Sequence, residues 1–321
     1  MSPTFGRVMS AMVTPFDADE NLDLDAAQAL ASWLVDSQGH EGLVLAGTTG
    51  ESPTLTHDEQ GQLFRAVREA VSVPIIAGTG SNDTRAAVDL TKRAVQAGVD
   101  GLLVVTPYYN RPSQAALVDH FAAVAAAGDD VPTLIYDIPV RTGRKVETEN
   151  LLTLAHDVSN IVGVKDAAGD PAETAVLLSQ APDGFEIYSG DDGLTLPFMA
   201  VGAVGAIGVA THWTGPEHVQ MFDAFASGDV AKARQLNAMM LPSMDFASMV
   251  DAPNPIPTKA MMRMLGHAVG RGRSPMHIEP PGLEAAAHAI IEGSGRGNKN
   301  GRQNRQQQHW QNCVSNTHPN G

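Results

Sequence analysis

Cysteine is nearly absent from this sequence of 321 residues. The single cysteine, Cys313, lies close to the C-terminus, so the rest of the chain has no disulfide, no thiolate metal site and no cysteine nucleophile. Such low cysteine use fits a reducing compartment. Residues 1–16 also lack the basic stretch and long apolar run that mark a secretory signal. We therefore expect a cytoplasmic protein.

Basic residues are scarce relative to acidic ones. The chain has 21 Lys and Arg against 36 Asp and Glu, which gives a formal net charge of -15. Residues 293–321 contain four basic residues and no acidic one, so the first 292 residues carry about -19. A chain this acidic repels phosphate groups, and we expect neither nucleic acid nor an anionic membrane surface as a partner.

Metal-binding patterns and membrane spans are also missing. The histidines before residue 293 are scattered and form no ligand spacing such as H-E-x-x-H, so no metal site is expected. The uncharged stretch 193–211 approaches the length of a membrane span. Its glycines and Pro197 instead indicate a helix, a turn and a strand of a buried core.

Short apolar segments recur along the chain with helical segments between them. Most are apolar nearly throughout, which is typical of parallel strands that are covered on both faces. Eight such strands within about 210 residues favour a (β/α)8 TIM barrel over a doubly wound sheet. The expected strands are 8–16, 42–49, 74–80, 101–107, 132–139, 161–167, 185–192 and 205–211.

Capping signals mark the starts of two helices. Thr56 with Glu59, and Asp25 with Gln28, have the spacing of a capping box. Further helices are expected after the last strand, at 216–227, 230–249, 256–265 and 282–291. We therefore predict three parts: a catalytic barrel (1–227), a C-terminal helical appendix (228–292) and a disordered low-complexity tail (293–321).

Lys165 is the unusual residue in this pattern. It follows the apolar run Ile161–Val164, so it projects from a buried strand near the carboxyl end, where reactive groups of such barrels lie. Lowering the pKa of a lysine from about 10.4 to near 7 requires roughly 4–5 kcal/mol, which burial can supply. The uncharged amine could then form an imine with a carbonyl group. The alternative is a buried salt bridge with Asp166 or Asp191.

Other polar side chains follow neighbouring strands. Tyr136 could transfer protons near Lys165, and Thr48 could extend such a relay. The alternatives are a core tyrosine with a satisfied hydroxyl and an ordinary turn hydroxyl. The glycine-rich segment 47–52 offers backbone N–H groups and hydroxyls that suit a small carboxylate. Arg141 could bind a carboxylate bidentately or be a solvated surface arginine.

Six motifs, in order and at matching spacing, resemble the family of 4-hydroxy-tetrahydrodipicolinate synthases, also called dihydrodipicolinate synthases. They are G-T-T-G-E-S (47–52), V-T-P-Y-Y-N-R-P (105–112), Y-D-I-P-V-R-T-G (136–143), G-V-K-D-A (163–167), S-G-D-D (189–192) and N-P-I-P-T-K (254–259). The resemblance implies a lyase that condenses pyruvate with L-aspartate 4-semialdehyde, early in diaminopimelate and lysine biosynthesis. It also implies a homotetramer, a dimer of dimers, that uses no cofactor and no metal.

The resemblance also implies catalytic roles. Lys165 would form the Schiff base with pyruvate. Tyr136, Thr48 and Tyr109 would form a proton relay, with Tyr109 reaching in from a neighbouring subunit.

Four further residues would bind the substrates. The resemblance implies that Thr49 holds the carboxylate of pyruvate and that Arg141 binds the carboxylate of the semialdehyde. Gly190 and Ile207 would contribute backbone groups near the imine.

The sequence departs from the family pattern in two places. Asp137 stands where the family often has Asn. Family members inhibited by lysine carry a His and a Glu that align near Gln60 and Ala86, and both are missing here. Other residues of that region are present, namely His57, Asn82 and Tyr108. We therefore predict weak or absent inhibition by lysine.

Two other functions remain open at this point. N-acetylneuraminate lyase or a keto-deoxy-sugar aldolase would share Lys165 and Tyr136, but Arg141 suits a second carboxylate better than sugar hydroxyls. The acidic pair Asp191-Asp192 after the seventh strand argues against a phosphorylated sugar. A non-catalytic ligand-binding barrel is the alternative of another class, since fold alone does not settle function.

Overall fold

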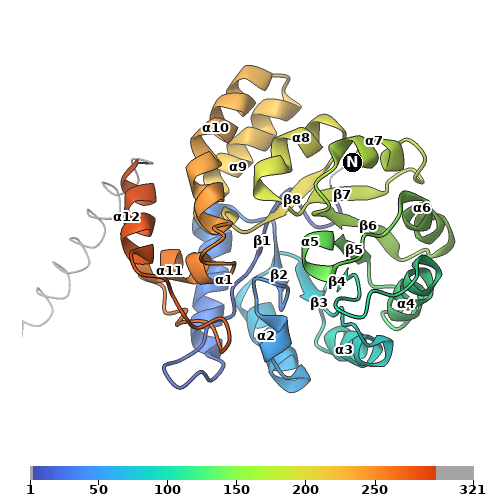
Figure 1. Ribbon diagram of the computed structural model, residues 1–321, viewed down its shortest axis with the longest axis horizontal. Coiled ribbons are helices and arrows are strands. Elements are labelled where there is room, and N and C mark those ends of the chain that lie inside the picture. The colour runs from blue at the N-terminus through green and yellow to red at the C-terminus, as the bar shows by residue number, and fades with distance from the viewer. Residues whose placement is uncertain (1–2, 294–321) are drawn as a thin grey trace, which may run out of the picture.

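The computed structural model describes residues 3–293, so all of the predicted tail except Gly293 lies outside the described residues. Eight parallel strands close into a barrel in chain order, with β1 paired to β8, and helices surround it (Figure 1). The predicted TIM-barrel fold is confirmed. The strands are β1 (Val8–Ala11), β2 (Gly42–Leu45), β3 (Ile75–Gly78), β4 (Gly101–Val105), β5 (Thr133–Asp137), β6 (Ile161–Asp166), β7 (Glu186–Ser189) and β8 (Gly205–Gly208).

The strands are shorter than the apolar runs that predicted them. β1 ends at Ala11, and the apolar residues up to Phe16 continue as a buried loop. β2 ends at Leu45 because Ala46 has a positive φ of 49°, which no strand residue adopts. The additional apolar residues bury their side chains around the strands, and burial alone does not distinguish them from strand residues.

The helices pack on the outside of the barrel. Between the strands lie α1 (Leu24–Gln38), η1 (Ser52–Thr54), α2 (His57–Ala70), α3 (Thr84–Gln96), α4 (Gln114–Ala126), α5 (Pro139–Thr142), α6 (Thr148–Asp157), α7 (Pro171–Leu178), η2 (Asp192–Leu194) and α8 (Thr195–Ala200). After β8 come α9 (Thr211–Ala226), α10 (Val230–Ala247), α11 (Ile256–Met264) and α12 (Leu283–Gly293).

The two predicted capping boxes have different outcomes. Thr56 and Glu59 bond reciprocally at the start of α2, as predicted. The prediction for Asp25 is wrong, because α1 is capped by Asp23, whose carboxylate accepts the backbone N–H of residue 26 at 2.9 Å. The side chain of Gln28 instead donates to a backbone carbonyl of α2. Asp23 forms the cap because it lies directly before the first helical residue, where a short side chain reaches the free backbone N–H groups.

The C-terminal helices lie together on one side of the barrel (Figure 1). α10 packs on α9, and α12 packs on α10 and α11. α9 begins at Thr211, earlier than predicted, with a kink at Thr214 two residues before Pro216. The division of the chain after residue 227 stays a prediction.

The uncharged stretch 193–211 contains most of η2, all of α8 and the strand β8. Across residues 3–293, none of the helices is long and apolar enough to cross a membrane.

Candidate active site

Lys165 and Tyr136 lie side by side inside the barrel. They are register partners on β6 and β5, and the Nζ atom of Lys165 lies 4.2 Å from the centroid of the Tyr136 ring. Lys165 is only 4% exposed, and this burial lowers its pKa to about 7, although the negative charge of Asp192 acts in the opposite direction. At neutral pH, a large fraction of this amine is therefore uncharged and able to attack a carbonyl.

The alternative of a buried salt bridge is not supported. None of the ion pairs within residues 3–293 includes Lys165. Asp166 is the next residue on the strand and therefore faces the outside of the barrel. There its carboxylate accepts hydrogen bonds from the hydroxyl of Thr174 at 2.6 Å and the backbone N–H of Ala168 at 2.9 Å.

The hydroxyl of Tyr136 is connected to Thr48. Burial raises the pKa of Tyr136 to about 12, while the hydrogen bond with Thr48 and the positive charge of Arg141 act to lower it. Tyr136 is thus a protonated phenol in a position to donate or accept a proton beside Lys165. The structure therefore brings two members of the predicted relay together.

Tyr109 is not brought into the site of its own chain. Its side chain is 91% exposed, and its backbone has a φ of 72°. Arg111 also has a positive φ, 46°, so the turn after β4 holds two non-glycine residues in a costly conformation. This turn directs a large aromatic side chain into solvent.

The loop after β2 is tightly built. An added Cβ at Gly50 would lie 3.0 Å from the backbone nitrogen of Ala46, so only glycine fits there without displacement. Thr49 is 2% exposed, and its Oγ1 atom accepts a hydrogen bond from Nδ2 of Asn254 at 2.9 Å. Glu51 has a φ of 56° and forms a buried ion pair with Lys259 at 2.7 Å.

Asn254 and Lys259 received no role from the sequence, although both lie in the motif at 254–259. They lie beside the loop after β2 only because the C-terminal helices pack against this part of the barrel. The available signal for burial was the apolar run 260–262, which follows Lys259 directly in a predicted helix. The identity of its partner, about 200 residues away in sequence, was not readable from it.

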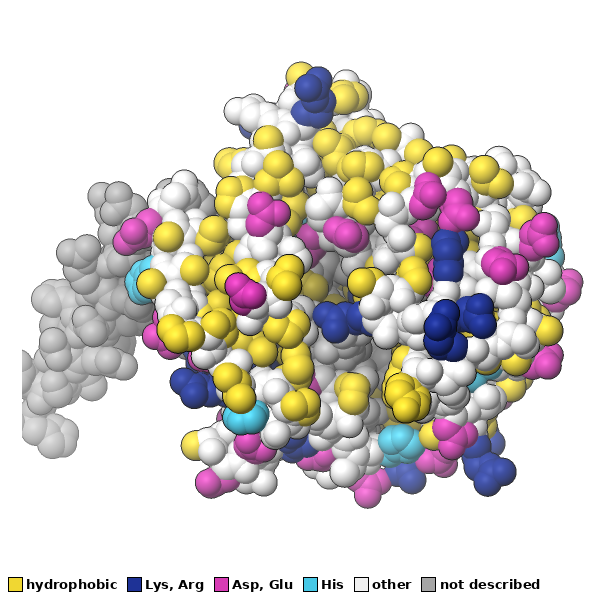
Figure 2. All heavy atoms as spheres, in the orientation of Figure 1, with side chains coloured by type: hydrophobic (Ala, Val, Ile, Leu, Met, Phe, Trp, Pro, Cys, Tyr) yellow, Lys and Arg dark blue, Asp and Glu magenta, His cyan; other side chains and the backbone are white. Residues whose placement is uncertain are grey.

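A cavity of about 320 Å³ opens at this end of the barrel. Its lining includes Thr48, Tyr108, Arg141 and Asn254. Arg141 lies in α5 directly after β5, and its side chain is both exposed to solvent and part of the cavity wall. Figure 2 shows the molecule hollowed near the centre of one face, with a basic side chain visible in the hollow.

The remaining two predicted residues are Gly190, which follows β7 and adjoins Lys165, and Ile207, which lies on β8. An added Cβ at Gly190 would lie 3.0 Å from Cγ of Lys165, so the glycine makes room for the lysine stem. Ile207 is fully buried on β8. The carboxylate of Asp192 accepts the backbone N–H groups of Val209 and Ala210 after β8, at 2.9 Å each. These donors are therefore not free to bind a phosphate.

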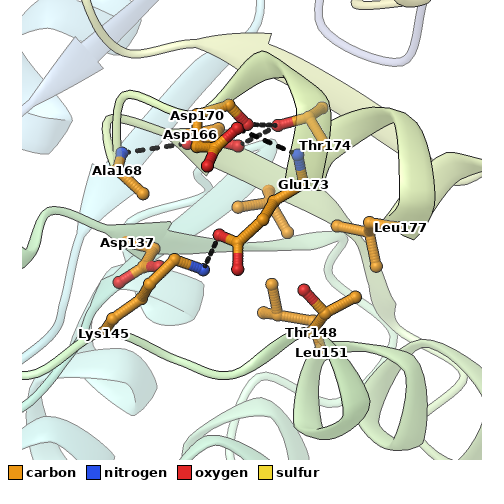
Figure 3. Close-up of a pocket in the computed structure, with 11 residues that line it drawn as sticks. Asp137, Lys145, Thr148, Leu151, Asp166, Ala168, Asp170, Glu173, Thr174 and Leu177 are labelled. Atoms are coloured by element: carbon orange, nitrogen blue, oxygen red, sulfur yellow. Dashed lines mark hydrogen bonds and ion pairs between the residues drawn. The ribbon is translucent and has the colours of Figure 1, made fainter.

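A second group of titratable side chains lies on the outer side of β5 and β6 (Figure 3). Burial raises the pKa of Asp137 to about 7, although the charge of Lys145 acts in the opposite direction. Lys145 pairs with Glu173 at 2.7 Å. The space enclosed by this group is about 10 Å³, room for about one water molecule and none for a substrate.

Among the described residues, histidine and carboxylate groups do not gather into a metal site. Within residues 3–293, no group of three or more such residues is placed to hold a metal ion.

Known proteins resemble this chain closely. The sequence model of the dihydrodipicolinate synthetase family matches residues 4–290. The 4-hydroxy-tetrahydrodipicolinate synthase of Moorella thermoacetica is 49% identical over 274 residues, which cover 85% of this chain and 92% of that protein.

Solved structures agree in fold. The crystal structure of a dihydrodipicolinate synthase from Bacillus anthracis has a TM-score of 0.86 at 40% identity, covering 91% of this chain and 99% of that one. The enzyme of Cyanidioschyzon merolae, crystallised with lysine bound, has a TM-score of 0.88 at 38% identity, covering 92% of this chain and all of that one. The family predicted from the motifs is confirmed: this chain belongs to the dihydrodipicolinate synthetase family.

Proposed function

We propose that this protein condenses pyruvate with L-aspartate 4-semialdehyde to give 4-hydroxy-tetrahydrodipicolinate, an early step of diaminopimelate and lysine biosynthesis. The observation that carries the proposal is Lys165, a buried amine with a pKa of about 7 inside the mouth of a barrel of this family. Such an amine is a nucleophile for the ketone carbon of pyruvate.

The reaction follows from Lys165 and its neighbours. The amine attacks the ketone, water leaves, and the resulting imine loses a proton from the methyl carbon to become an enamine. The enamine carbon then forms a bond to the aldehyde carbon of the semialdehyde, and the aldehyde oxygen takes a proton to become a hydroxyl. The amino group of the semialdehyde next attacks the imine carbon and displaces the amine of Lys165, which closes the ring and frees the enzyme. Each step moves a proton, and the phenol of Tyr136 with the hydroxyl of Thr48 is placed to carry these protons.

Binding of the two substrates is assigned to the residues around Lys165. Thr49 holds the carboxylate of pyruvate, and Gly190 and Ile207 present backbone groups near the imine. Arg141 binds the carboxylate of the semialdehyde, since its side chain reaches the cavity and a guanidinium group can bind a carboxylate bidentately.

Assembly completes the relay in this proposal. Tyr109 extends into solvent from its own chain, so it serves the site of a neighbouring subunit in a homotetramer built as a dimer of dimers.

The protein works in the cytoplasm and needs neither cofactor nor metal. Inhibition by lysine is weak or absent, because Gln60 and Ala86 stand at the positions of the two lysine-binding residues. Gln60 is buried and donates to the backbone carbonyl of Ser52.

The test is pyruvate consumption with L-aspartate 4-semialdehyde, compared with N-acetylmannosamine under the same conditions. We expect rapid consumption with the semialdehyde only, because Arg141 provides a partner for its carboxylate. Consumption with the sugar instead would assign the protein to the sialic-acid lyases and remove the proposed role of Arg141.

The imine itself is tested by reduction with borohydride in the presence of pyruvate. A mass increase located on Lys165 is expected. Its absence would favour the alternative of a non-catalytic ligand-binding barrel.

A further inference from the structure

The segment that leads into α11 contacts the loop that holds Thr49. Asn254, two residues before α11, donates from Nδ2 to Oγ1 of Thr49 at 2.9 Å. Asn254 also lines the cavity at the barrel mouth, whereas the side chain of Thr49 is almost completely buried. The amide thus lies at the border between the substrate space and the proposed carboxylate site.

The hydrogen bonds of Asn254 have a defined direction. The hydroxyl of Thr258, one turn along α11, donates to Oδ1 of Asn254 at 3.2 Å. Since Oδ1 is an acceptor and Nδ2 a donor, this contact turns Nδ2 toward Thr49. Thr258 is fully buried, so no water competes for its hydroxyl.

This direction has a consequence for Thr49. A threonine hydroxyl has one hydrogen to donate, and its oxygen can accept at the same time. Because the oxygen already accepts from Asn254, the hydrogen is directed to another acceptor. A carboxylate is an acceptor only, so it is the complementary group.

We propose that Asn254 is a positioning residue for pyruvate: its amide donates to Thr49 and thereby orients the Thr49 hydroxyl hydrogen toward the carboxylate of pyruvate, with Thr258 fixing the orientation of the amide. The inference rests on the proposed function, in which Thr49 binds that carboxylate. The neutral amide of Asn254, which the C-terminal helices hold in place, thereby determines whether the Thr49 hydroxyl acts as a donor or an acceptor toward the carboxylate.

The loop has a separate anchor, so the polarity of the hydrogen bond can be changed without releasing the loop. Glu51 pairs with Lys259 at 2.7 Å, and both side chains are almost completely buried. The second carboxylate oxygen of Glu51 accepts the backbone N–H of Arg273 at 2.9 Å. These contacts do not involve Asn254.

The decisive variant is Asn254→Asp, which keeps the shape of the side chain and reverses its hydrogen bonding. An ionised carboxylate at this position accepts the Thr49 hydrogen and adds a negative charge beside the substrate carboxylate. We expect the KM for pyruvate to rise about 10- to 100-fold, while kcat at saturating pyruvate stays within about threefold. Asn254→Ala, which only removes the donor, should raise KM about 3- to 10-fold.

Three further variants make the test specific. Thr258→Val removes the hydroxyl that orients the amide and should raise KM about threefold, and it provides a second test if the aspartate variant does not fold. Gln235→Glu, on the exposed face of α10, adds the same charge away from the site and should leave KM unchanged. Thr49→Val should raise KM at least as much as Asn254→Ala.

The outcomes distinguish the role of Asn254 from the role of Thr49. If Thr49→Val raises KM but the Asn254 variants that fold do not, the role of Asn254 is overturned and that of Thr49 stands. If Thr49→Val also leaves KM unchanged, the carboxylate does not bind at Thr49 and both assignments fail. A fall in kcat with an unchanged KM in Asn254→Asp would likewise overturn the positioning role.

Discussion

The inner and outer sides of β5 and β6 carry two groups with the same pKa and different surroundings. Lys165 faces the inside of the barrel and Asp137 the outside, and burial moves the pKa of each to about 7. The two sides alternate because successive side chains of a strand point in opposite directions. Tyr136 and Lys165 are therefore register partners inside, and Asp137 and Asp166 are register partners outside.

The difference lies in what each group can reach. The inner pair adjoins Thr48, which bonds to Tyr136 and lines a cavity of about 320 Å³. The outer group encloses about 10 Å³, and hydrogen bonds and an ion pair connect its members (Figure 3). A shifted pKa alone thus does not mark a catalytic group. The two cases differ in that the inner pair is bonded to a residue that lines a space the size of a substrate.

The largest expected difference is between the two lysines. Lys165→Ala should lower turnover by a factor on the order of 10⁴ or more, because the proposed imine forms on this amine. The variant should remain folded, as shown by circular dichroism. Lys145→Ala on the outer side is the matched control and should retain turnover within about threefold. Near-wild-type turnover in Lys165→Ala would contradict the imine mechanism.

The two tyrosines beside Lys165 provide the next comparison. Tyr136→Phe should lower kcat about 10²- to 10³-fold, because in the proposed mechanism the phenol carries protons. Tyr188, the register partner of Lys165 on β7, bonds instead to Glu186 at 2.6 Å. Tyr188→Phe should therefore change kcat by less than about threefold. Equal losses in steady-state assays of both variants would remove the special role of Tyr136.

The pH dependence of imine formation sharpens the comparison of Lys165 with Asp137. The neutral fraction of an amine with a pKa of about 7 rises about tenfold between about pH 6 and pH 8, so borohydride trapping at low pyruvate should accelerate by that factor. In Asp137→Asn the profile should be unchanged. If the pH profile of borohydride trapping shifts in Asp137→Asn, the carboxyl of Asp137 and not the amine of Lys165 controls the pH dependence.

Asp137→Asn should instead change stability. The pKa of Asp137 is raised from 3.8 to about 7 in the folded protein, so the folded state binds more protons than the unfolded state in this window. The wild-type protein therefore loses stability as pH rises through that window, and the Asn variant does not. Urea unfolding should show the variant gaining roughly 2–4 kcal/mol relative to the wild type between about pH 4 and pH 7. A constant difference would contradict the raised pKa.

The smallest effect is expected for Glu173→Gln. The ion pair of Glu173 with Lys145 is partly exposed, with side-chain exposures of 48% and 33%. Such pairs contribute about 1 kcal/mol or less, so urea unfolding should change by no more than that and turnover should not change. A loss of turnover here would mean that the outer group serves the reaction after all.

The sequence was sufficient for the barrel and for the inner side of the strands. Parallel strands buried on both faces appear as continuous apolar runs, and Lys165 was visible because it interrupts such a run near its end. The prediction was weaker at the strand ends. Met12 and Val13 are as apolar as strand residues but lie in a buried loop, and Pro15 is a local sign that the strand does not continue.

Contacts between distant parts of the chain were not predictable. Asn254 and Thr49 are separated by 205 positions, and Glu51 and Lys259 by slightly more. No periodicity connects them, because their proximity follows from how α11 packs beside the barrel. The outer group around Asp137 was missed for a related reason: its members come from β5, β6, α7 and the segment before α6, and each alone resembles a surface charge.

The hydrogen bond from Asn254 to Thr49 also fixes an order of events during protein synthesis. The ribosome releases residues 47–52 early and residue 254 about two hundred residues later. All eight barrel strands have been made by residue 208, before the amide that orients Thr49 exists. A nascent chain can therefore contain every strand, Lys165 and Tyr136 and still lack an oriented site for the substrate carboxylate. In our proposal, competence to bind the substrate carboxylate is therefore acquired only after residue 254 has been made, later than the residues assigned to the chemistry.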